Sequence, residues 1–145
     1  MTASEQRKEQ REYISSATLM VLGTDLLPSS VSSLLRMRPS QSWQRGEPKT
    51  FRGKPLGETL HEWGGWKKSL PPSQMARSLE RQVRYWARLL EGRADAFSEL
   101  NGLGCRCALN CYVGTSGTAT IALAPELQTA IGRLGLTLEL DVWAS

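Results

Sequence analysis

Apolar residues recur with the period of an α-helix over residues 73–91, SQMARSLERQVRYWARLLE. Pro71 and Pro72 precede this run, Ser73 is a natural N-cap, and Gly92 can adopt the left-handed conformation that ends a helix. The pattern therefore predicts one continuous helix whose apolar side must lie against a flat apolar partner. That side is formed by Met75, Leu79, Val83, Trp86, Leu89 and Leu90.

Alternating apolar and polar residues predict the strands that supply this partner. The alternation runs over residues 13–23, 105–113 and 136–143. The sequence GTSGT at 114–118 predicts a hairpin turn that leads into a further strand over 118–124. In the last strand, the positions expected to face inward are Leu136, Leu138, Leu140 and Val142.

Three shorter helices are predicted from apolar residues at helical spacing, and two of them begin at a proline. They start at Pro28, Ala94 and Pro125. Residues 36–72 differ from the rest of the chain because proline and glycine are frequent there. Short strands are expected around 42–44 and 66–69, joined by a long loop of the kind that often binds a partner.

Together these elements predict a fold of the α+β class. We expect a mostly antiparallel sheet with one long and two or three short helices packed on one face. A chain of 145 residues is long enough for one domain with a buried core. The predicted organisation is a polar N-terminal tail at 1–12 followed by a single α+β domain at 13–145.

Composition and charge restrict the partners and the cellular location expected for this chain. The net charge of +4 permits an acidic partner without requiring one. No apolar run approaches the ~20 residues that a membrane-spanning helix needs, and the start of the chain lacks the apolar centre of a secretory signal. Three cysteines are too few for a disulfide framework. The expected location is therefore the cytoplasm, without a membrane partner.

Residues that carry catalytic or metal chemistry are sparse. Cys105, Cys107 and Cys111 share one strand face, but tetrahedral zinc needs four ligands, and the single histidine, His61, is distant in sequence. No nucleophile elbow accompanies His61, and GTSGT lacks the lysine of a phosphate-binding loop. The sequence therefore predicts small, buried, apolar cysteines, no metal, no cofactor and no enzymatic activity.

Four arginines fall together on the polar side of the predicted long helix. Guanidinium groups in such a row bind carboxylates or phosphates. The alternative is a solvated helix face, because Glu80 lies four residues before Arg84 and Glu91 lies three residues after Arg88. We call Arg77, Arg81, Arg84 and Arg88 the arginine row.

Three of the five tryptophans lie in the glycine-rich and proline-rich segment that contains Arg45 and Arg52. Tryptophan and arginine dominate the energetic centres of protein interfaces. They are therefore candidates for contact with a partner. The other interpretation is that Trp43 and Trp66 are strand residues packed under the long helix. The sequence leaves both interpretations open for Trp43, Trp63 and Trp66.

The order of several motifs resembles the bacterial domain of unknown function 4279 family. They are GTDLLPSSVSSLL at 23–35, SWQRGEP at 42–48, GGW at 64–66, the long helix, and ALAPELQTAIGRLGLTLELDVW at 122–143. The resemblance runs from about Tyr13 to Trp143. It implies an α+β domain and no established catalytic residues. By looser analogy, compact bacterial proteins of this kind include immunity partners of secreted toxins.

The leading functional hypothesis is a non-enzymatic binding module that docks a protein partner. Its most concrete version is an immunity-type inhibitor that blocks, by steric occlusion, a bacterial toxin with an acidic surface. The alternative is weak nucleic-acid binding through the basic loop 36–54 and the arginine row. The predicted partner-binding residues are Trp43, Arg45, Arg52, Trp63, Trp66, Arg77, Arg81, Arg84 and Arg88.

Overall fold

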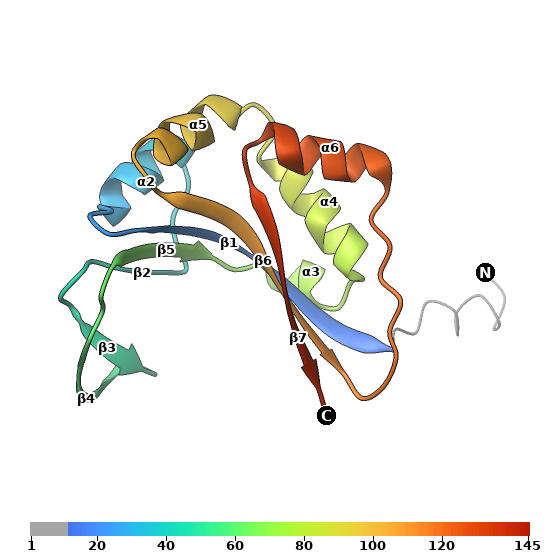
Figure 1. Cartoon of the computed structure of the whole chain (residues 1–145), viewed down its shortest axis with the longest axis horizontal. Helices are drawn as coiled ribbons and strands as arrows, with labels where there is room; N and C mark the ends of the chain where they lie inside the picture. The colour runs from blue at the N-terminus through green and yellow to red at the C-terminus, as the bar shows by residue number, and fades with distance from the viewer. Residues whose placement is uncertain (1–11) are drawn as a thin grey trace, which may run out of the picture.

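A five-stranded mixed sheet forms the centre of the domain (Figure 1). The computed structural model describes residues 12–145, so the predicted tail at 1–12 lies, except for Glu12, outside the described residues. Neighbouring strands of the sheet are antiparallel except for the last two, which are parallel. In spatial order the strands are β2 (Gln41–Trp43), β5 (Gly64–Lys68), β1 (Tyr13–Gly23), β6 (Arg106–Thr115) and β7 (Thr137–Ala144).

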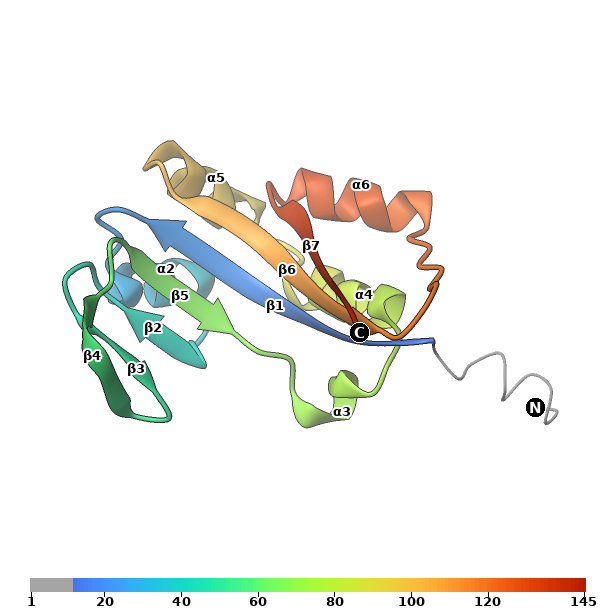
Figure 2. The ribbon, with the colours of Figure 1, turned by 60° about the horizontal axis from the view of Figure 1, so that its bottom comes forward.

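The helices in the described part of the chain are α2 (Pro28–Leu35), α3 (Pro72–Met75), α4 (Leu79–Leu89), α5 (Ala94–Gly102) and α6 (Pro125–Arg133). All except α3 bury side chains in one core together with alternate residues of β1 and β6. Because alternate residues of a strand point to one face, these four helices lie on the same side of the sheet (Figure 2). The predicted α+β class with a mostly antiparallel sheet is confirmed. Within residues 12–145, no helix has the length and apolar character needed to cross a membrane.

The helix predicted over 73–91 is two helices with a break between them. The first helix ends at Met75 and the second begins at Leu79. Ser78 caps the second helix, because its Oγ accepts a hydrogen bond from the backbone N–H of Arg81 at 3.3 Å. The prediction of one continuous helix capped by Ser73 is therefore wrong, and a strong N-cap residue inside the periodic run is the local reason.

A buried amide side chain connects this break to the sheet. The Nε2 atom of Gln82 lies within 3.4 Å of the backbone oxygens of Ser15, Gln74, Met75 and Arg77. Its Oε1 atom accepts a hydrogen bond from the backbone N–H of Ala17 at 3.0 Å. Since β5 pairs with β1 only over residues 19–23, Gln82 satisfies backbone groups of β1 that no strand reaches on that side.

The long loop expected between two short strands contains an antiparallel hairpin, β3 (Pro48–Phe51) and β4 (Lys54–Leu60). Arg52 and Gly53 form its two-residue turn, and both have positive φ angles, 52° and 80°. Positive φ at both central positions is the geometry that matches the twist of paired strands. Pro48, Pro55 and Gly57 interrupt the alternation that would have predicted these strands.

The prediction of a strand over 118–124, and of a hairpin turn before it, is wrong. These residues form an irregular connection between β6 and α6. The chain then returns as β7, which is parallel to β6, and a parallel pair requires a crossover connection rather than a tight turn. The apolar residues Ile121 and Leu123 pack against the core from this connection. Their alternation therefore reflects packing without strand pairing.

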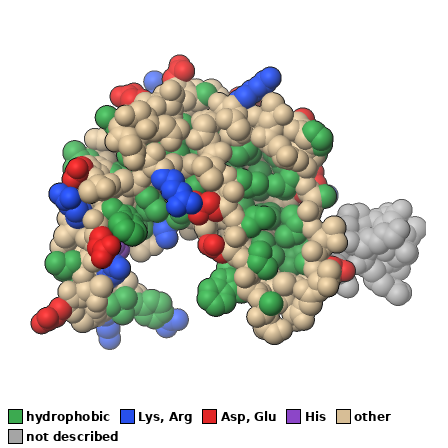
Figure 3. Space-filling view, in the orientation of Figure 1, with side chains coloured by type: hydrophobic (Ala, Val, Ile, Leu, Met, Phe, Trp, Pro, Cys, Tyr) green, Lys and Arg blue, Asp and Glu red, His purple; other side chains and the backbone are tan. Residues whose placement is uncertain are grey.

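Helix α6 covers only the first half of β7. Leu136 is buried and Leu138 packs against the core, as predicted, because α6 lies over this end of β7. Leu140 and Val142 were also expected to face inward, but they are 53% and 60% exposed. Figure 3 shows hydrophobic side chains in the gap between β7 and the connection that precedes α6. The prediction failed because the helix ends before the strand does.

Candidate functional site

A hairpin arm projects from the β2 end of the sheet (Figure 1). We define the hairpin arm as residues 48–63, and every residue of its strand β4 is exposed. None of its residues belongs to the hydrophobic core. Its large exposed apolar side chains are Phe51, Leu56, Leu60 and Trp63. Large apolar side chains that gather on a projecting element are typical of a protein-interaction surface.

Backbone and ring contacts fix the base of the hairpin arm. The N–H of Gly46 donates to the carbonyl of His61 at 2.8 Å, and the N–H of His61 donates to the carbonyl of Glu47 at 2.9 Å. The imidazole of His61 stacks on the indole of Trp43 with ring centroids 4.8 Å apart. Arg45 forms an exposed ion pair with Asp25 at 3.1 Å. The arm therefore leaves the domain from an ordered base.

The three tryptophans of this segment have different environments. Trp66 is fully buried, and its Nε1 donates to the Oγ of Ser32 on α2 at 3.0 Å. It belongs to the core, so its predicted place on a contact surface is corrected. Trp43 is 9% exposed, with its ring between Gly65 and His61. Trp63 is 49% exposed and is the tryptophan of the segment that offers a large free surface.

The face of the sheet without helices forms a hollow beside the hairpin arm (Figure 3). It lies between the arm and the end of β7. Two polar pairs cross this face: Arg106 with Glu139 at 2.8 Å, and Asn110 with Asp141 at 2.8 Å. These groups neutralise or hydrogen-bond one another, and exposed apolar side chains lie at both ends of this face, on the hairpin arm and at Trp143 of β7.

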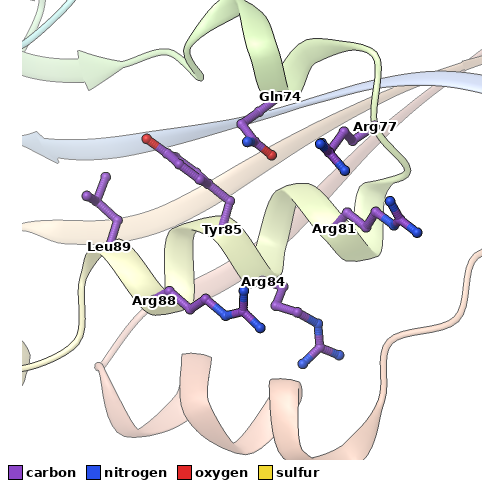
Figure 4. A pocket seen from close by; sticks show the side chains of 7 residues that line it. All are labelled: Gln74, Arg77, Arg81, Arg84, Tyr85, Arg88 and Leu89. Carbon is purple, nitrogen blue, oxygen red and sulfur yellow. The ribbon is translucent and has the colours of Figure 1, made fainter.

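The arginine row lines a pocket of about 630 Å³ beside α3 and α4 (Figure 4). Arg84 and Arg88 reach toward α6, and Gln74 and Arg77 lie on the α3 side of the pocket. Helical spacing brings Arg81, Arg84 and Arg88 of α4 to one side, and Arg77 reaches the same pocket from the break before α4. Arg84 and Arg88 also line a neighbouring groove of about 400 Å³ between α4 and α6.

The members of the arginine row differ in their electrostatic partners. Arg84 forms ion pairs with Glu80 at 2.9 Å and with Glu126 at 3.5 Å. The hydrogen bond that Arg84 donates to Glu80 is the largest cause that raises the pKa of Arg84 above its ordinary value. Within residues 12–145, no carboxylate lies within 4.0 Å of the guanidinium groups of Arg77, Arg81 or Arg88. These three cations are therefore free to bind an anion.

Sequence reasoning overlooked the apolar residues of the hairpin arm and the role of Gln82. Phe51, Leu56 and Leu60 stand among prolines, glycines and charged residues, where no periodic pattern singles them out. Recognition of Arg52–Gly53 as a two-residue turn would have predicted the hairpin and placed these side chains on it. For Gln82, a polar residue on the apolar side of the helix was the available signal.

Cys107 and Cys111 are buried thiols, and Cys105 is partly exposed. Burial raises the pKa of Cys107 to about 12 and that of Cys111 to about 12, and it also raises the pKa of Cys105. These groups are therefore protonated at neutral pH. Among the described residues, no three histidine, cysteine or acidic side chains gather as metal ligands would. His61 takes part in the stack on Trp43 and has no nucleophile beside it in the described contacts.

The family model described as Domain of unknown function (DUF4279) matches residues 11–145. The match covers the whole sheet, the helices, the hairpin arm and the arginine row. No curated protein and no solved structure matches the chain.

Proposed function

The chain belongs to the DUF4279 family, and on that premise we propose that it is a non-enzymatic binding module that docks a protein partner through the hairpin arm. One observation carries the proposal. Phe51, Leu56, Leu60 and Trp63 are about half exposed or more on an element that contributes nothing to the core.

The hairpin arm has no hydrophobic core of its own. A two-stranded hairpin is only marginally stable in water, and burial of one Leu or Phe side chain is worth about 1.5–3 kcal/mol. Contact with a partner would bury such side chains around Trp63. Arg52 and Lys54 lie at the turn of the arm, whereas Glu58 and Glu62 lie toward its base, so the turn end favours an acidic partner surface.

A projecting arm fits a cleft better than a flat surface. The proposed mechanism is therefore steric occlusion, in which the arm enters the partner's cleft and the body of the domain covers its mouth. An immunity-type inhibitor of a bacterial toxin with an acidic cleft is the most concrete form of this proposal. The hollow beside the arm would then receive the rim of the partner's cleft.

The double variant L56S/W63S is expected to weaken capture of the partner at least tenfold, because it removes two apolar anchors from the contact. The measurement is quantitative capture from an extract of the source cells on immobilised domain, followed by titration of the captured protein. Since the two side chains are exposed, the melting temperature should stay within a few degrees of that of the unchanged protein.

The matched control is L103S, which changes an exposed leucine at the end of α5, away from the hairpin arm. It should capture the partner as the unchanged protein does. Equal capture by L56S/W63S and the unchanged protein would contradict docking through the arm.

The arginine row favours a second candidate function, weak binding of a nucleic-acid backbone. Arg81 and Arg88 of α4, together with Arg77 from the break before it, present three cations without described acidic partners around one pocket. The basic loop 36–54 lies at the other end of the domain in both ribbon views (Figures 1 and 2). We therefore assign this candidate to the row alone, without the loop.

For this second candidate, the logarithm of the affinity for a short single-stranded DNA is expected to fall with the logarithm of salt concentration with a slope of about −2. Three phosphate contacts at about 0.7 each produce that value. Fluorescence anisotropy measures it. R81E/R88E should abolish binding, whereas K49E/K54E, with the same change of net charge, should retain it. A flat salt response, or equal losses in both variants, would reject the row as a nucleic-acid site.

A further inference from the structure

The outer edge of β7 carries free backbone hydrogen-bonding groups. At its end, the N–H of Ser145 donates to the carbonyl of Thr115 on β6 at 3.0 Å. Backbone groups of successive strand residues alternate between the two sides, so the even-numbered residues direct theirs away from β6. In the described residues no strand pairs on that side. The free edge is therefore formed by the N–H and C=O groups of Leu138, Leu140, Val142 and Ala144.

Apolar side chains flank this edge on both faces of the sheet. Leu140 and Val142 are more than half exposed on the face that carries the helices. On the opposite face, Trp143 is 67% exposed and stands in register with Gly114 of β6 and Ile14 of β1. An edge strand with exposed apolar residues on both faces attracts another strand.

The features that usually protect an edge strand are missing or engaged here. Proteins protect such edges with lysine, proline, bulges or free charges. The segment from Thr137 to Ala144 contains neither lysine nor proline, and its pairing with β6 has no register shift. Its two acids are held on the sheet face, Glu139 by Arg106 and Asp141 by Asn110. The edge itself is therefore open to pairing.

We propose that β7 pairs antiparallel with β7 of a second copy of this chain, which joins two five-stranded sheets into one. The two-fold axis passes beside Val142. In this register Val142 faces Val142 of the second copy, Leu140 faces Ala144, and Asp141 faces Trp143. Leu140, Val142 and Ala144 then face even-numbered residues, so these free backbone groups of the two edges meet.

The positions of Glu139 and Asp141 favour this register over those centred on Leu140 and Asp141, because here neither acid faces an acid of the second copy. With Leu140 on the two-fold axis, Glu139 of one copy would face Asp141 of the other. With Asp141 on the axis, the two Asp141 side chains would face each other. Like charges directly opposite one another destabilise a strand pair. With Val142 on the axis, Glu139 faces Ser145 and no acid faces an acid.

The mass of the protein in solution tests this pairing. Sedimentation velocity from micromolar to millimolar concentration should show a monomer–dimer equilibrium. L140E should weaken self-association at least tenfold, because it places a charge in the apolar contact. Adding A144K to L140E should restore it, because residues 140 and 144 of the two copies face each other only in the proposed register. Circular dichroism should be the same for all three proteins.

L103E is the matched control, since it places the same charge on an exposed leucine just after α5 and should leave the dimer intact. A monomer at every concentration would overturn the proposal and leave the edge for a strand of another protein. A dimer that survives L140E would overturn it too, by placing the contact on another face. A dimer lost in L140E that A144K does not restore would reject the register centred on Val142.

Discussion

Replacing Gln82 with leucine is expected to lower the free energy of unfolding by about 3 kcal/mol. The change keeps the side chain close to its original size but removes both polar groups of a fully buried amide. It leaves the N–H of Ala17 and the carbonyl of Ser15 without their side-chain partner. Each buried backbone group that loses its partner costs about 1–3 kcal/mol.

Urea denaturation followed by circular dichroism measures this effect. Q82E is the informative companion variant, because a carboxylate accepts a hydrogen bond from Ala17 but, when ionised, cannot donate one to Ser15. Q82E should therefore be destabilised at neutral pH. Burial beside carbonyl oxygens raises the pKa of the introduced carboxyl in the folded state, so stability should recover as the pH falls. A loss below 1 kcal/mol for Q82L would show that the amide is not needed to close this edge.

Replacing Gly65 with alanine is expected to lower the free energy of unfolding by about 2 kcal/mol and to displace the ring of Trp43. A Cβ atom at position 65 would overlap Cζ2 and Cε2 of Trp43 and lie 2.7 Å from Cη2. His61 stacks on the same indole, so a tilt of the ring away from position 65 would disturb that stack. The new methyl group must therefore either strain the strand pair or break the stack.

Thermal unfolding and tryptophan emission measure the two effects separately. The expected result for G65A is a lower melting temperature together with a red-shifted emission, because the indole gains contact with water. G132A is the matched control, since a Cβ there meets nothing within 4 Å and an alanine inside α6 favours the helix. A G65A protein as stable as the unchanged one would show that the Trp43 ring is loosely held.

Periodic patterns in the sequence predict the elements that bury one continuous face. For β1, α2, α5 and α6 the predicted and observed segments agree within a few residues, because their apolar residues all enter the same core. Patterns fail where the deciding interaction is distant in sequence. The buried position of Gln82 depends on its bonds to β1, more than sixty residues away along the chain.

The candidate surfaces follow the same rule. Arg81, Arg84 and Arg88 were predictable as neighbours because their spacing belongs to α4, whereas Arg77 lies in the break before that helix. The different environments of Trp43, Trp63 and Trp66 were not, since they depend on α2 and on the path of the hairpin arm. Exposure at the end of β7 depends on where α6 ends. That is a property of packing, and the alternating pattern of the strand does not contain it.

Side-chain bonds from α4 close the open border of β1, and this has a consequence for cooperativity. Gln82 and Trp86 bind the backbone of Ala17, and the backbone N–H of Leu79 donates to the hydroxyl of Tyr13 at 3.2 Å. The helix cannot separate from the first strand without exposing those peptide groups to solvent. Amide hydrogen exchange at Ala17 should therefore proceed only through global opening, at the same slow rate as the centre of the sheet.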